Sequence, residues 1–206
     1  MKTNSGFDLL APIYDSLARF VFGKSIVDSQ TWYLDKIPAD SRVLILGGGT
    51  GWLLEELRKR NSSCTVWYIE ISQKMIERAC HRDLKPTVHF IQGTEKEIPA
   101  NQKFDVVITN FYLDLFSEKA LKEVVDRINS HTTTSTLWLV TDFVNGGKWW
   151  HKLMLKTMYL FFKLVCGIEA NHLPEWFAQL RSQGWREANT KVWYSHFIKS
   201  TVWSRV

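Results

Sequence analysis

Hydrophobic and polar residues follow one another along the chain in a pattern that predicts strands and helices in turn. Five short apolar runs have the length and composition of buried strands. They are Val43–Leu46, Thr65–Ile69, Val88–Gln92, Phe104–Ile108 and Thr136–Val140. The segments between them carry apolar residues at helical spacing, as in Trp52–Arg58, Gln73–Cys80 and Ser117–Ser130. This alternation is typical of an α/β fold with a parallel sheet and helices on both faces.

The last part of the chain departs from this alternation. Pro174–Gln183 is predicted to form a helix. Trp185–Tyr194 and Phe197–Arg205 are predicted strands, joined near Ser195 and His196. Because the connection is so short, we expect these two strands to form an antiparallel hairpin at the end of the sheet.

A glycine-rich turn follows the first predicted strand, with the sequence Gly-Gly-Gly-Thr-Gly at residues 47–51. Glycine lets the backbone turn sharply and approach a ligand where a Cβ would obstruct it. Since a helix begins directly afterwards, the stretch has the strand–turn–helix order of a nucleotide-binding site. A dinucleotide fingerprint would need a further glycine at position 52, which is Trp52. The spacing Gly47, Gly49 and Gly51 therefore does not predict a dehydrogenase.

An acidic residue ends the second predicted strand. Glu70 lies about twenty residues beyond the glycines, where such a fold presents an acid to ribose hydroxyls. A carboxylate can accept two hydrogen bonds from a vicinal diol. We therefore predict that Glu70 binds a nucleoside, and that Ser72 caps the helix that follows.

Several motifs together resemble those of the class I S-adenosylmethionine-dependent methyltransferases, most closely the group that includes the ubiquinone and menaquinone C-methylating enzymes. The glycine spacing is similar to the first motif of this family. Residues 11–15 (A-P-I-Y-D) resemble its A-x-x-Y-D leader, and Phe104–Tyr112 resembles its fourth motif. Gly93–Pro99 resembles a G-D-A-x-x-L-P segment, with Thr94 in place of the aspartate that contacts the adenine amino group.

The resemblance implies S-adenosylmethionine as the cofactor and S-adenosylhomocysteine as its product. It assigns the donor site to residues of the glycine turn, the strand ends and the N-terminal segment: Tyr14, Gly47, Gly49, Gly51, Glu70, Ile71, Thr94, Glu95 and Asn110. A hydroxyl, a backbone group or Glu95 would replace the aspartate missing at Thr94. For Tyr14 a second interpretation stays open, in which it is a half-buried residue of an amphipathic helix packed on the sheet.

The resemblance also implies a doubly wound, Rossmann-like sheet of seven strands in the order 3-2-1-4-5-7-6, with helices on both faces. We expect residues 1–206 to form a single methyltransferase domain. Residues 1–40 are expected to form an N-terminal helical cap, and residues 145–172 a helical insertion before the last helix and the hairpin.

Composition and charge argue against several other classes. The chain has 206 residues and a net charge of +5 without a dense run of Lys and Arg, so no nucleic-acid partner is expected. Three widely spaced cysteines without a C-x-x-C pair indicate reduced thiols in a cytoplasmic protein, with neither disulfides nor a metal site. No apolar run reaches the length of a signal sequence or transmembrane helix. The oligomeric state stays open.

The segment from Lys148 to Lys163 is predicted to be an unusually apolar helix. Its lysines, at positions 148, 152, 156 and 163, fall on one narrow stripe, and nearly all its other residues are large and apolar. Such a helix must bury a wide face against the sheet, against a lipophilic acceptor or in the interface of an anionic membrane. We favour a lid packed on the body of the protein, with peripheral membrane contact as the alternative.

The predicted function is the transfer of a methyl group from S-adenosylmethionine to a small lipophilic or aromatic acceptor. A carbon or thiolate acceptor needs little beyond positioning, whereas a phenol or amine needs a base. Asp142, His151, His172 and Tyr112 are candidates, and the spacing identifies none of them as catalytic. Two alternatives remain: a non-catalytic cofactor-binding protein on the same fold, and a membrane-surface interaction protein that uses the lysine-striped helix.

Overall fold

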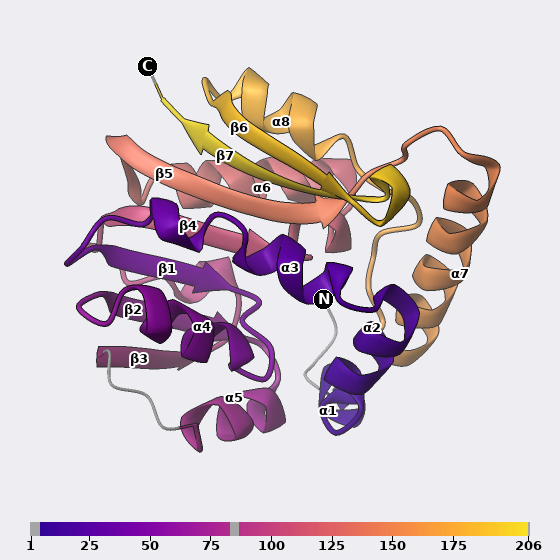
Figure 1. Ribbon diagram of the computed structural model, residues 1–206, viewed down its shortest axis with the longest axis horizontal. Coiled ribbons are helices and arrows are strands. Elements are labelled where there is room, and N and C mark those ends of the chain that lie inside the picture. The colour runs from indigo at the N-terminus through magenta and orange to yellow at the C-terminus, as the bar shows by residue number, and fades with distance from the viewer. Residues whose placement is uncertain (1–4, 83–86, 206) are drawn as a thin grey trace.

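The computed structural model describes residues 5–82 and 87–205, and a seven-stranded sheet forms its centre (Figure 1). The strand order is β3-β2-β1-β4-β5-β7-β6, as predicted. The first five strands are parallel, and β7 pairs antiparallel with both β5 and β6. The strands are β1 (Arg42–Leu46), β2 (Thr65–Glu70), β3 (Thr87–Gln92), β4 (Phe104–Asn110), β5 (Thr132–Phe143), β6 (Arg186–Trp193) and β7 (Ile198–Ser204).

Helices cover both faces of this sheet. The α-helices are α1 (Ser5–Leu10), α2 (Tyr14–Phe22), α3 (Ser25–Thr31), α4 (Trp52–Arg60), α5 (Gln73–Cys80), α6 (Glu118–Asn129), α7 (Trp149–Cys166) and α8 (Trp176–Ser182). Short 3-10 helices also occur in the described residues: η1 (Leu34–Lys36), η2 (Glu95–Glu97), η3 (Leu113–Leu115) and η4 (Tyr194–His196). Within the described residues, no helix is both long and apolar enough to cross a membrane.

The two faces of the sheet carry separate hydrophobic clusters. Leu44 and Leu46 of β1 pack on the side of α6 and α8, whereas Val43 and Ile45 pack on the side of α4. Successive side chains of a strand point to opposite faces, so a strand buried on both sides must be apolar throughout. This requirement explains why the uninterrupted apolar run of β1 identified it from the sequence.

Local signals set several element boundaries. The hydroxyls of Ser72 and Ser117 accept hydrogen bonds from backbone N–H groups in the first turns of α5 and α6, so both predicted caps are confirmed. Two elements are longer than predicted. Strand β5 begins at Thr132 instead of Thr136, across an irregularity in its pairing with β4. Helix α7 continues past Lys163 to Cys166, and the left-handed φ of 66° at Gly167 ends it.

Helices α1, α2 and α7 lie beyond the carboxyl ends of β1, β4 and β5, on the right of Figure 1. A third hydrophobic cluster holds them there, and it includes Phe22 of α2, Phe143 of β5 and Tyr159 of α7. The Tyr194 hydroxyl of η4 also donates a hydrogen bond to the carbonyl of Val21, at 2.9 Å. In open α/β sheets ligands bind at the carboxyl edge, so these helices cover the edge where a site is expected.

Candidate functional site

The glycine turn between β1 and α4 forms one wall of a cavity at the carboxyl edge. Gly47, Gly49 and Gly51 all have left-handed φ angles, between 65° and 82°. A Cβ at Gly47 would lie 2.7 Å from the ring of Tyr112, and one at Gly51 would lie 2.5 Å from the Cβ of Ala79. Gly47 and Gly49 line the cavity, whereas Gly51 lets α4 and α5 pack closely and is not among the lining residues.

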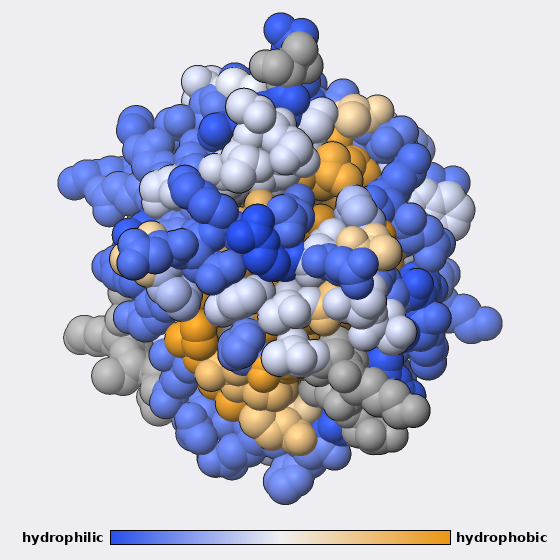
Figure 2. All heavy atoms as spheres, turned by 90° about the vertical axis from the view of Figure 1, so that its left-hand side faces the viewer, coloured by the Kyte–Doolittle hydropathy of each residue, from blue (hydrophilic) through white to orange (hydrophobic). Residues whose placement is uncertain are grey.

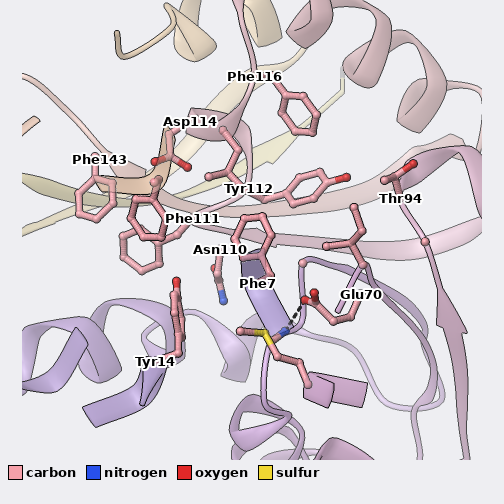
Figure 3. Close-up of a pocket in the computed structure, with 17 residues that line it drawn as sticks. Phe7, Tyr14, Glu70, Thr94, Asn110, Phe111, Tyr112, Asp114, Phe116 and Phe143 are labelled. Atoms are coloured by element: carbon pink, nitrogen blue, oxygen red, sulfur yellow. Dashed lines mark hydrogen bonds between the residues drawn. The ribbon is translucent and has the colours of Figure 1, made fainter. Parts of the chain in front are cut away.

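Glu70 points into this cavity from the end of β2 (Figure 3). Its carboxylate accepts hydrogen bonds from the backbone N–H groups of Gly49, at 2.9 Å, and Ser72, at 2.8 Å. Burial raises the pKa of Glu70, while these backbone donors act in the opposite direction. Each carboxylate oxygen has two acceptor positions, so Glu70 holds the glycine turn and keeps capacity for a ligand hydroxyl.

Asn110 ends β4 beside the glycine turn and also lines the cavity. Within the described part of the chain its buried amide nitrogen Nδ2 has no hydrogen-bond partner. Figure 3 shows this nitrogen directed into the space between Tyr14 and Phe7. A buried donor without a partner is costly, so its position marks a place where a bound ligand would complete the hydrogen bonding.

The other sequence-predicted residues divide into two groups. Tyr14, Ile71 and Thr94 line the cavity, although the Thr94 hydroxyl also accepts a hydrogen bond from the N–H of Lys96 and caps η2. Glu95 is turned away, because its carboxylate accepts a hydrogen bond from the Tyr112 hydroxyl at 2.8 Å. The structure thus brings together seven of the nine predicted residues and leaves Gly51 and Glu95 outside the lining.

Aromatic residues that the sequence analysis did not single out complete the cavity. They are Phe7, Phe116, Phe143 and Phe162. The ring of Phe7, from α1, lies in the middle of the view in Figure 3, between Asn110 and Tyr112. Phe111 adopts a left-handed φ of 51°, an uncommon conformation for a bulky residue that is often found at functional sites. Phe111 belongs to the motif-like stretch Phe104–Tyr112, but no motif marked the other four phenylalanines, because they come from segments far apart in the chain.

Two further cavities adjoin this one. A polar cavity on the other side of the glycine turn is lined by Asp15, Arg19 and Gln30, among others. A larger apolar cavity of about 330 Å³ lies between α2 and α7. Tyr14 and Phe111 line all three cavities, and Phe143 and Phe162 line both the first and the apolar one. The three cavities therefore meet at Tyr14 and Phe111, next to the glycine turn.

A pair of buried carboxyl groups lies beside this junction. Asp142 accepts hydrogen bonds from the backbone N–H groups of Leu113, Asp114 and Phe143, at 2.8 to 3.2 Å, so it stabilises the turn after β4 and the turn at its own strand end. Asp114 lines the first cavity, and its Oδ1 has no partner among the described residues. Burial raises the pKa of Asp114 to about 7, and burial together with Asp114 raises that of Asp142.

Asp114 is a functional candidate that the sequence analysis missed, although it stands just after the motif-like stretch at the end of β4. With a pKa near neutrality and an oxygen at the cavity, it can accept a proton from a bound molecule.

The histidine candidates lie elsewhere and do not line this cavity. Nδ1 of the fully buried His151 accepts a hydrogen bond from the Gly146 N–H at 3.0 Å, and His172 is exposed and lines none of the three cavities.

The raised pKa of Asp114 predicts that the protein loses stability as the pH rises. The folded state holds the carboxyl proton up to a pKa of about 7, whereas the unfolded chain releases it near its ordinary value of 3.8. The stabilisation is complete below the lower pKa and is lost as the pH passes the higher one. Between about pH 5.5 and 8 we expect the free energy of unfolding of the unchanged protein to fall by about 2 kcal/mol because of Asp114. The variant Asp114→Asn has no such carboxyl group and should not show this decrease. Urea unfolding of both proteins across this range measures it, and parallel pH curves would contradict it.

Comparison with known proteins places these features in a family. A family model described as a methyltransferase domain matches residues 43–134. The malonyl-[acyl-carrier protein] O-methyltransferase of Halalkalibacterium halodurans is 29% identical over 106 residues, which are 49% of this chain and 38% of that protein. The enzyme of the same name from Acetivibrio thermocellus is 34% identical over 89 residues, 41% of this chain and 31% of that protein. The match thus spans about a third of the length of these relatives.

Solved structures share the fold over nearly the whole chain. A methyltransferase of Haloferax volcanii, solved in complex with a methyltransferase activator, superposes with a TM-score of 0.73 at 12% identity, covering 98% of this chain and 97% of that one. Magnesium protoporphyrin IX methyltransferase of Synechocystis PCC 6803, with S-adenosylhomocysteine bound, gives a TM-score of 0.66 at 16% identity, covering 89% and 83%. These solved structures show the fold alone, and it is the match of residues 43–134 to the methyltransferase-domain model that places this part of the chain, with its strand order and glycine turn, among the class I S-adenosylmethionine-dependent methyltransferases.

Proposed function

We propose that this protein transfers a methyl group from S-adenosylmethionine to a small apolar acceptor. The observation that carries the proposal is the convergence of the glycine turn, the Glu70 carboxylate and the unpartnered Asn110 amide on one cavity. Main-chain N–H groups, a carboxylate and an amide are the groups that bind the polar parts of an amino-acid-bearing nucleoside. The apolar cavity that joins this one supplies room for an acceptor.

The two smaller cavities suggest how the donor lies. The cavity with Glu70 would hold the adenosine, with its ribose hydroxyls on the carboxylate and its base near Ile71 and Thr94. The polar cavity contains Asp15 and Arg19, whose opposite charges match the ammonium and carboxylate groups of the methionine part. The sulfonium would then lie at the junction near Tyr14, where the apolar cavity also begins.

The cavity between α2 and α7 favours an acceptor with a substantial apolar part. Its lining is almost entirely aliphatic, aromatic and methionine side chains, among them Leu10, Val21, Met158 and Phe161. Methyl transfer is an in-line displacement, for which the protein's main contributions are to align the two reactants and to exclude water. The aromatic walls would provide both, and Asp114 would take the proton if the acceptor is a hydroxyl or an amine.

Calorimetry with S-adenosylhomocysteine tests the donor site. We expect a measurable heat of binding with the folded protein, and the absence of binding would contradict the whole proposal.

Transfer is tested with methyl-tritiated S-adenosylmethionine and a cell extract. Label in the fraction soluble in organic solvent supports the apolar acceptor. Label only in the aqueous polymer fraction contradicts the acceptor class, and binding without any transfer indicates a non-catalytic cofactor-binding protein.

A further inference from the structure

Helix α7 presents an apolar stripe to the solvent on the side that faces away from the sheet. Trp149, Leu153, Leu160 and Leu164 are between 55% and 78% exposed. Their spacing of four, seven and four residues places them along one line of the helix. The opposite side of α7 is used for packing, through buried residues such as Leu155 and Tyr159. Contiguous exposed apolar side chains of this size mark a surface that binds something.

A basic stripe runs directly beside the apolar one. Lys152, Lys156 and Lys163 are exposed and lie three or four residues from members of the apolar stripe. The sequence of α7 contains no Asp or Glu, so every charge that the helix itself carries at neutral pH is positive. A helix with large apolar side chains next to lysines has the composition of one that lies in the interface of a membrane.

Helix α2 lines the apolar cavity opposite α7 and also carries exposed apolar side chains. Its Phe20 is 88% exposed, and Leu17 of the same helix is partly exposed and lines the apolar cavity. Thr157 of α7 is exposed and lines this cavity from the other side. The cavity therefore opens to the surface between α2 and α7, next to the apolar stripe. Figure 2 shows another side of the molecule, the left of Figure 1, where hydrophilic atoms cover most of the surface.

We propose that the outer surface of α7 docks on a bilayer that contains anionic lipids. Charge complementarity decides for this partner: anionic headgroups match the lysines, while the apolar side chains enter the headgroup region. A dimer formed through α7 is disfavoured, because α7 of a second copy would place its own lysines against these lysines and has no carboxylate to pair with them. A further consequence, which rests on the proposed function, is that the acceptor is an amphiphile that reaches the cavity from the membrane.

Vesicle co-sedimentation tests the docking. The probes are vesicles of phosphatidylcholine alone and of phosphatidylcholine mixed with phosphatidylglycerol. We expect binding to the mixed vesicles that weakens with added salt, and little binding to phosphatidylcholine alone. The double variant Lys152→Ala/Lys156→Ala is expected to bind the mixed vesicles about thirtyfold less tightly. The variant Leu160→Glu/Leu164→Glu is expected to lose binding to them.

The matched control is Lys119→Ala/Lys122→Ala, which removes two exposed lysines from α6 and should bind like the unchanged protein. Calorimetry with S-adenosylhomocysteine shows whether each variant is folded, and none of these residues lines the donor cavity. Absent vesicle binding, or equal loss in the control, overturns the docking and leaves the proposed function standing. A dimer in ultracentrifugation that Leu160→Glu/Leu164→Glu disrupts, with no vesicle binding, would make a second copy the occupant instead.

Discussion

Glu70→Ala is expected to lower the affinity for S-adenosylhomocysteine by about ten- to a hundredfold, which corresponds to about 1–3 kcal/mol. The substitution removes the acceptor for the ribose hydroxyls. It also removes the group that holds the Gly49 N–H at 2.9 Å and thereby fixes the glycine turn. Both losses act on the same ligand, so the effect on binding should exceed the effect on stability. Isothermal calorimetry at neutral pH measures it.

Two further variants make this prediction specific. Glu70→Gln keeps the shape of the side chain but leaves a single acceptor oxygen, so an intermediate loss of affinity is expected. Glu77→Ala makes the same alanine change at an exposed position on α5 and should leave affinity unchanged. If Glu70→Ala binds as well as the unchanged protein while remaining folded, the carboxylate has only a structural role in the turn.

Asp142→Ala is expected to destabilise the protein by about 3–5 kcal/mol. The Asp142 side chain is fully buried and accepts hydrogen bonds from three backbone N–H groups, at Leu113, Asp114 and Phe143. Alanine would leave these donors buried without partners and would release the start of η3, which lines the cavity. Urea unfolding at about pH 6 measures the change, because Asp114, with a pKa of about 7, stays largely protonated there.

Asp105→Ala is the matched control for the buried aspartate. Asp105 also accepts hydrogen bonds from a backbone N–H and a side chain, both of Arg42, but it lies at the surface with 39% of its side chain exposed. A pair of this kind contributes about 1 kcal/mol or less, since water solvates both partners. Equal destabilisation by the two substitutions would show that the buried hydrogen bonds of Asp142 do not govern the stability of this edge of the sheet.

The strands and helices could be predicted from the sequence because their signals are local, whereas the strand order was implied by the resemblance to a known family. The run Val43–Leu46 is apolar without interruption since β1 is buried on both faces, and Ser72 and Ser117 cap the helices that follow them. The position of Glu70 at the end of the second strand, about twenty residues beyond the glycine turn, predicted its place at the cavity. The apolar run and the helix caps depend on residues within a few positions of one another, and the place of Glu70 depends on the order of two neighbouring strands.

The functions of individual loop residues were less predictable. Spacing made Gly51 equivalent to Gly47 and Gly49, but only the approach of Ala79 from α5 shows that Gly51 serves packing. Glu95 stood where a ligand contact was expected, and its partner is Tyr112, seventeen residues further along the chain. In both cases the orientation of a side chain depends on a second segment that a short motif does not contain.

The sequence by itself determined the individual strands, the helix caps and the glycine turn, because apolar periodicity, capping residues and glycine spacing act over a few residues. Only the tertiary structure decided what surrounds the turn. It placed Phe7 and Phe162 in one cavity, put Asp114 against Asp142 and left the apolar and basic stripes of α7 at the surface. These outcomes follow from the packing of segments distant in the chain, which no local pattern specifies.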